Sequence, residues 1–136
     1  MKKFLTTAVI AAFAAAAFAV GFSTADFKAV EAGAPAAVNS GTATTNTFAV
    51  AGYTGLGEIL ASYSAASTNC TFTVTIEGTN TVSGGWAPIA TASSSGKTSG
   101  IVRVPFSSIY LPPTVRVIRA ASGANATATS AVFLSR

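Results

Sequence analysis

Apolar and polar side chains alternate strictly over one segment in the middle of the chain. Its apolar positions are Cys70, Phe72, Val74 and Ile76, and its polar positions are Thr71, Thr73, Thr75 and Glu77. Successive side chains of a strand point to opposite faces, so this pattern predicts a strand with one buried and one exposed face. Threonine suits the exposed face because it is β-branched and polar.

Similar short runs rich in strand-forming residues recur along the rest of the chain. Seven runs can be distinguished, over residues 45–53, 57–65, 70–78, 86–92, 100–106, 114–121 and 126–135. Short turns separate them, which is typical of hairpins and sandwich corners. No amphipathic helical pattern follows the first segment of the chain. The pattern predicts an all-β fold, a single antiparallel β-sandwich of about seven to eight strands that is jelly-roll or immunoglobulin-like.

Two of these runs carry arginines between apolar positions. In IVRVPF, Pro105 cannot donate to a strand ladder, which predicts an edge strand or a strand end. In TVRVIRAA, two valines alternate with Arg116 and Ile118. An arginine that faces outward beside an apolar neighbour suits contact with another subunit. We therefore take Arg116, Ile118 and Arg119 as candidate subunit contacts.

The amino-terminal segment differs from everything that follows it. Two lysines precede an apolar run from Phe4 to Phe22. A basic start, an apolar run and small residues after it have the form of a secretory signal, with release of the chain at Val20 or at Asp26. The alternative is a retained helix that anchors in a membrane or packs into an assembly, since the run is near the lower length limit for crossing a bilayer. Both alternatives stay open.

The chain therefore divides into three parts. Residues 1–25 form the apolar segment, a signal peptide or a retained helix. Residues 26–45 are rich in Ala, Gly, Ser and Thr and show neither a helical stripe nor strand alternation, so we expect an extended arm or linker. Residues 46–136 form the sandwich domain.

The composition argues against catalysis. Only 9% of the residues are charged and 50% are hydrophobic, so hydroxyl groups supply most of the polarity. Histidine is absent, and the acids are Asp26, Glu31, Glu58 and Glu77. These two facts remove most routes to general acid–base chemistry. We expect no enzymatic activity, no catalytic residue and no cofactor.

Charge and cysteine content exclude further kinds of ligand and cross-link. The formal charge of +4 is scattered along the chain and forms no cluster of the kind that binds nucleic acid. Cys70 is the single cysteine, which excludes an intrachain disulfide framework and a cysteine-based metal site. Because it alternates with apolar residues, we expect it to be a small core residue. The sequence gives no metal-ligand cluster.

One loop has a partial likeness to a phosphate-binding loop. The stretch SGKTSG around Lys97 contains the Gly-Lys-Thr that ends such a loop. The motif also needs a glycine at the position of Thr91 and a helix after the loop, whereas a predicted strand follows here. We therefore expect Lys97 to be a solvated loop residue.

Aromatic residues offer one candidate ligand site. Trp86, Tyr53 and Tyr110 could form a platform for a sugar ring. A tryptophan at the start of a strand after two glycines more commonly closes the end of a sandwich core, and this is the position that we favour for Trp86. The ligand platform belongs to the alternative function below.

The order of the segments resembles that of small β-sandwich structural proteins of bacteriophages, which are capsid decoration or minor virion proteins. The resemblance covers residues 45–136 and is carried by YTGLGEILASYSAAS, TFTVTIEGTNT, GGWAPIA, IVRVPF, PTVRVIRAASG and TATSAVFLSR. It implies a place in the virion, self-association or binding to a major capsid protein, and action through subunit contacts.

Two functions follow from the sequence. The first is a non-enzymatic virion structural protein, either a capsid decoration protein or a minor capsid component, whose amino-terminal segment would touch a membrane if it is retained. The alternative is an exported carbohydrate-binding or adhesin module, periplasmic or extracellular, that binds a glycan through Trp86 and the tyrosines.

Overall fold

The computed structural model describes residues 27–32, 35–79, 84–107 and 111–135, with side chains from residue 35 onward. The predicted signal peptide or retained helix of residues 1–25 lies outside these ranges, as does Tyr110. The described residues contain strands and no helix long and apolar enough to span a membrane. The strands are β1 (Phe27–Ala32), β2 (Ala36–Val38), β3 (Thr44–Ala49), β4 (Leu56–Ala65), β5 (Thr71–Thr79), β6 (Trp86–Ser95), β7 (Ser99–Ser107), β8 (Thr114–Ser122) and β9 (Ala126–Ser135).

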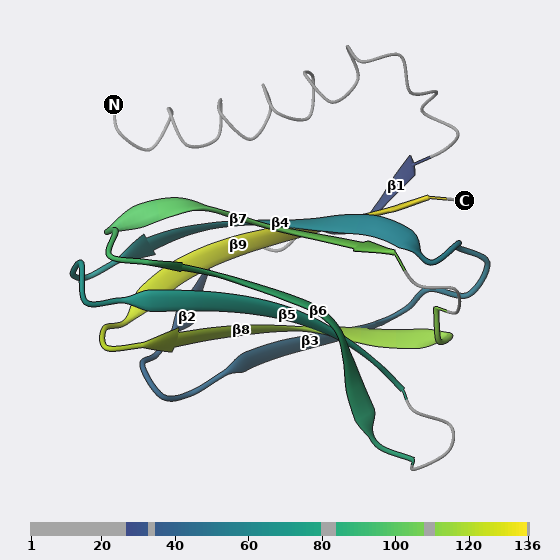
Figure 1. Ribbon diagram of the computed structural model, residues 1–136, viewed down its shortest axis with the longest axis horizontal. Coiled ribbons are helices and arrows are strands. Elements are labelled where there is room, and N and C mark those ends of the chain that lie inside the picture. Colours follow the sequence, from purple (N-terminus) through teal and green to yellow (C-terminus); the bar gives the residue numbers. More distant parts are fainter. Residues whose placement is uncertain (1–26, 33–34, 80–83, 108–110, 136) are drawn as a thin grey trace.

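These strands form two sheets that stack as two layers (Figure 1). Sheet A has the order β1-β9-β4-β7, with β2 also paired to β9, and sheet B has the order β3-β8-β5-β6. Every pairing between named strands is antiparallel. The predicted all-β antiparallel sandwich is therefore confirmed.

The strand order is that of a jelly roll. β1 and β2 both pair with β9, at opposite ends of it, so they are two pieces of one interrupted strand. Counted in this way, each sheet has four strands, and consecutive strands cross from one sheet to the other, except that β5 and β6 are neighbours in sheet B. The immunoglobulin-like alternative is not the arrangement observed.

The prediction of a linker at residues 26–45 has to be corrected. Within this segment, β1 and β2 belong to sheet A, and β3 begins at Thr44 in sheet B. The segment is extended, but it pairs with β9 and β8 of the same chain and does not stand apart from the sandwich. Strand pairing depends on backbone hydrogen bonds, and a run of small residues can form them without showing an alternating pattern.

The core lies between the sheets and is built from the inward positions of both. Its largest fully buried side chains include Phe72, Ile59, Ile76 and Leu134. Cys70 is also fully buried, as expected. The Tyr63 ring of sheet A stacks on the Phe72 ring of sheet B with 4.8 Å between centroids, so this pair joins the two layers. Burying one such large side chain stabilises the fold by about 1.5–3 kcal/mol.

Two local features agree with the backbone rules. Pro105 lies in β7, an edge strand of sheet A that pairs on one side only, and edge strands are where the missing donor of proline is tolerated. Gly123, in the turn between β8 and β9, has a φ of 78°, where a side chain is strained. A Cβ at this position would also meet the carbonyl oxygen of Asn69. The turn therefore requires glycine.

Candidate binding faces

The outer face of sheet B carries mostly hydroxyl side chains. The outward positions follow from the registers of β3, β8, β5 and β6, because residues paired across antiparallel strands share a face. The hydroxyl residues on this face are Thr45, Thr47, Thr71, Thr73, Thr75, Thr79, Thr91, Ser93, Ser95, Thr114 and Ser122. Several of them bond to one another across β5 and β6.

Two hydrogen bonds between hydroxyl groups join β5 to β6 on this face. The hydroxyls of Thr73 and Ser93 lie 2.9 Å apart, and those of Thr75 and Thr91 lie 3.0 Å apart. In each pair one hydroxyl donates to the other, and both oxygens can still accept a hydrogen bond from outside. The bonds restrict the rotamers of these side chains, and this part of the face can offer acceptors to a partner.

At one end of the same face, three side chains form an aromatic–ion cluster, which we define as Glu77, Trp86 and Arg116. The Arg116 Nε donates to Glu77 Oε2 at 2.7 Å, and its Nη2 lies 2.6 Å from the same oxygen. The guanidinium carbon of Arg116 sits 4.5 Å from the centroid of the Trp86 ring. The side chains of Arg116 and Glu77 are 29% and 17% exposed. Partial burial strengthens both the ion pair and the cation–π contact relative to fully exposed ones.

A β-bulge positions Trp86 in this cluster. The pairing of β5 with β6 shifts between Ile76 and Glu77, so that Glu77 lies opposite Pro88 and Thr79 opposite Trp86. Thr79 points outward, and Trp86 therefore points outward with it. Without the shift, the alternation that places Thr91 and Ser93 outward would continue along β6 and turn Trp86 inward. The bulge thus decides which side of sheet B receives the tryptophan.

The core position that we favoured for Trp86 from the sequence is therefore wrong. Trp86 is half-buried on the outer face and is not among the apolar residues that pack against the core. The sequence pattern could not show this, because a glycine-rich turn and an initial tryptophan do not reveal a register shift. Tyr53, in contrast, does pack against the core, and Tyr63 is buried within it. The structure does not place Tyr53 on the face of Trp86.

Arg119 is a second correction. It was expected at a subunit contact. Arg116 and Ile118 point outward from β8, whereas Arg119 is on the opposite side of the strand and points inward, so it is only 2% exposed. Its Nη1 donates to the Ala128 carbonyl at 3.5 Å and its Nη2 to Asn46 Oδ1 at 3.3 Å. Its Nε has no hydrogen-bond partner among the described residues. A guanidinium in this position bonds to groups inside the sandwich and is not accessible to another subunit.

The remaining two candidate contacts, Arg116 and Ile118, do share the outer face of sheet B. Ile118 is paired with Thr75 on β5 and with Thr45 on β3, so it lies in the middle of the hydroxyl-rich face. Arg116 and Trp86 meet at its end. The structure thus brings together the residues that the sequence assigned to two different functions.

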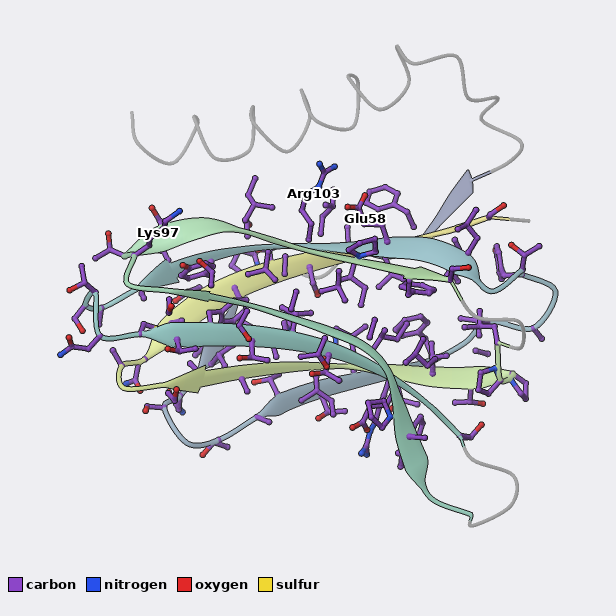
Figure 2. All side chains as sticks on the ribbon, viewed as in Figure 1. Glu58, Lys97 and Arg103 are labelled. Atoms are coloured by element: carbon purple, nitrogen blue, oxygen red, sulfur yellow. The ribbon has the colours of Figure 1, made fainter. Side chains whose placement is uncertain are left out.

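The outer face of sheet A has a different character. Leu56 and Ile101 are the large hydrophobic side chains most exposed in the described part of the chain, at 52% and 47%. Glu58 and Arg103 form an ion pair of 3.0 Å between β4 and β7. Figure 2 shows these two side chains projecting together from the outer side of the strands, away from sheet B. The sequence pattern contained this face in the outward positions of IVRVPF, but we did not select it.

The described residues offer no constellation for catalysis or metal binding. No group of three or more His, Cys, Asp or Glu side chains gathers within these ranges. Lys97 lies in the exposed loop between β6 and β7 (Figure 2). Trp86 is the first residue of β6, so the loop and the aromatic–ion cluster lie at opposite ends of that strand. A strand follows that loop, as predicted, so it lacks the helix of a phosphate-binding loop.

No protein-family model matches the sequence, and no curated protein is similar to it in sequence. Solved structures are similar at low identity. A mitogen from Yersinia pseudotuberculosis matches with a TM-score of 0.44 and 12% identity, over 77% of this chain and 84% of that chain. A carbohydrate-binding module in complex with calcium and xylotriose matches with a TM-score of 0.46 and 9% identity, over 79% and 98%. The structure of infectious bursal disease virus, Gx strain, matches with a TM-score of 0.45 and 12% identity, over 81% and 31%.

Proposed function

We propose that the chain is a non-enzymatic structural protein of a virion that acts through subunit contacts made by the outer face of sheet B. One observation carries this proposal. Ile118 and the aromatic–ion cluster lie on the same sheet face, whose remaining outward positions are largely hydroxyl groups. Tryptophan and arginine are enriched in protein interfaces, and charged residues that are already paired cost less to bury.

The contact would combine two kinds of interaction. Ile118 and the Trp86 ring supply apolar area, and the ordered threonine hydroxyls supply hydrogen-bond donors and acceptors. The partner in this proposal is another copy of the chain or the major capsid protein. The jelly-roll fold is compatible with this function but does not establish it, because one fold carries many functions.

Self-association and shell binding of the purified protein test the proposal. Ile118→Asp would place an unpaired carboxylate at the centre of the contact, and we expect it to convert an assembled protein to monomers in sedimentation measurements and to abolish shell binding. The matched control is Thr129→Asp, a half-buried outward position of sheet A. A wild-type protein that is a clean monomer and also fails to bind purified shells would contradict the proposal.

The outward position of Trp86 supports a second candidate, an exported carbohydrate-binding or adhesin module. A sugar ring could stack on an indole that stands on the sheet surface and could accept or donate hydrogen bonds at the neighbouring threonines. Because Trp86 does not pack against the core, Trp86→Ala should remain folded by circular dichroism. Glycan-array binding that disappears in this variant favours the second candidate, and the absence of glycan binding in the wild type removes it.

A further inference from the structure

The outer face of sheet A leaves apolar side chains in contact with water. Leu56 and Ile101 are exposed, and Leu60 and Phe133 are half-buried beside them. The registers place all four on one face: Phe133 pairs with Glu58, and Leu60 pairs with Arg103. We define these four residues as the apolar patch. Contiguous exposed apolar patches usually mark a contact surface.

The ion pair of Glu58 and Arg103 on this face does not prevent an apolar cover. Glu58 is bound by Arg103 at 3.0 Å, so neither side chain needs a new partner if the face is covered. Arg103 is 62% exposed, and its long side chain can move its charged end to the rim of a cover. A covering segment would therefore have to be apolar and need not carry compensating charge.

The chain itself contains such a segment. The residues before β1 include the apolar run from Phe4 to Phe22. β1 starts at Phe27, which pairs with Ser135 on β9. The neighbouring pair of Leu134 with Gly57 shows that this is the end of sheet A where Leu56 lies. The preceding residues therefore join the sandwich at one end of the apolar patch.

The lengths also agree. Leu56 lies at one end of the patch, and Ile101, which pairs with Ser62, lies at the other. The separation along β4 is six residues, or about 20 Å at the rise of a strand. A helix formed by the run from Phe4 to Phe22 would be about 28 Å long. It is therefore long enough to cover the patch after one reversal of the chain at residues 23–26.

We propose that residues 1–26 are retained and lie across the outer face of sheet A, where they cover Leu56, Leu60, Ile101 and Phe133. The segment then acts as a third layer on the sandwich instead of a signal peptide or a membrane anchor. This inference concerns the face opposite to the proposed subunit contact and does not depend on it.

Disulfide trapping in the full-length protein tests this placement. Cysteine replaces Ile101, and in four separate variants a second cysteine replaces one of residues 11, 12, 13 or 14, so that every side of a helix is sampled. The control series carries Ser93→Cys, an exposed position on the outer face of sheet B. The native Cys70 is fully buried and stays in place. We expect a disulfide within one molecule in at least one Ile101→Cys variant and in none of the Ser93→Cys series.

Proteolysis gives an independent measurement. In the double variant Leu56→Lys, Ile101→Lys, the patch can no longer hold an apolar segment, and chymotrypsin should cut at Phe13 and Phe18 at least tenfold faster than in the wild type. Ser93→Lys should not change the rate. The proposal is overturned by equal trapping in both cysteine series, by disulfides that form only between molecules, or by no trapping at all. It is also overturned by a native intact mass that begins at Val20 or Asp26.

Discussion

The two sheets have the same strand geometry, but one outer face is polar and the other is apolar. Sheet B exposes threonine and serine hydroxyls that bond to one another, with an aromatic–ion cluster at one end. Sheet A exposes leucine and isoleucine beside an ion pair. The polar face can remain in water at no cost, whereas the apolar face is more stable when covered. The two faces differ in chemistry, and for this reason we propose a different contact for each.

The ion pairs on the two faces sharpen the contrast. Both join a glutamate and an arginine on adjacent strands, but Arg116 and Glu77 are 29% and 17% exposed, whereas Arg103 and Glu58 are 62% and 32% exposed. Arg116 also packs on the Trp86 ring. Solvent weakens the pair on sheet A, and burial strengthens the pair on sheet B. The pair on sheet B holds the Arg116 side chain against Trp86. The pair on sheet A mainly neutralises two charges within an apolar surface.

The largest loss of stability is expected for a substitution in the core, which supports both sheets. Phe72→Ala removes the ring that stacks on Tyr63 and leaves a cavity between the sheets. We expect a loss of about 3–5 kcal/mol in the free energy of unfolding, measured by urea denaturation. Thr129→Ala, outside the core, should cost well under about 1 kcal/mol. Equal losses in the two variants would show that the core does not lie between the sheets as described.

The next effect distinguishes the two ion pairs. Glu77→Gln leaves the half-buried Arg116 guanidinium without a carboxylate, and it should cost about 1–2 kcal/mol of unfolding free energy. It should also free the indole, which can be followed by Trp86 fluorescence, because the chain has one tryptophan. An unchanged stability together with an unchanged emission spectrum would contradict the role given to the aromatic–ion cluster.

The buried arginine should behave unlike either surface arginine. Arg119→Met replaces a guanidinium whose Nε has no partner in the described part of the chain and whose bonds to Asn46 and Ala128 are 3.3 and 3.5 Å long. Since an apolar side chain of similar length avoids the cost of desolvation, we expect the variant to be more stable by about 1 kcal/mol. Thermal unfolding at matched pH measures the change. A loss of stability would mean that Arg119 has a stronger interaction than its geometry shows.

The smallest effect is expected at the exposed pair. Glu58→Gln should change the free energy of unfolding by less than about 0.5 kcal/mol, and by less still at high salt, because solvent and ions screen this pair. Urea denaturation at low and high salt checks both parts. A change as large as that of Glu77→Gln would remove the distinction between the two pairs.

Most of the sandwich could be predicted from alternation alone. β5 and the edge position of Pro105 were recognisable because each depends on local chemistry, namely side-chain period and a missing donor. β1 and β2 were missed, because their pairing with β9 is a long-range backbone contact that a run of small side chains does not indicate. Sequence-based reasoning is weakest where strands far apart in the chain meet.

The candidate site was predictable in part for the same reason. Arg116 and Ile118 face outward, as alternation with the valines of β8 predicts. The same alternation, carried one residue further, turns Arg119 inward, so the expected surface contact at Arg119 was inconsistent with the pattern. Trp86 depends on the bulge between β5 and β6, which involves two strands at once. No property of one strand read alone reveals that shift.

The central place of β9 in sheet A has a consequence for how the protein is made. β1 and β2 lie on one side of β9 and β4 lies on the other, so the first strands of the chain have no neighbour in their sheet until β9 has been synthesised. A ribosome that releases the chain amino-terminus first exposes β1 and β2 as unpaired edges for almost the whole of translation. The sandwich therefore closes late, in a step that joins the two most distant parts of the sequence and is slow for that reason. Until that step, the nascent chain exposes unpaired strand edges that a chaperone can bind.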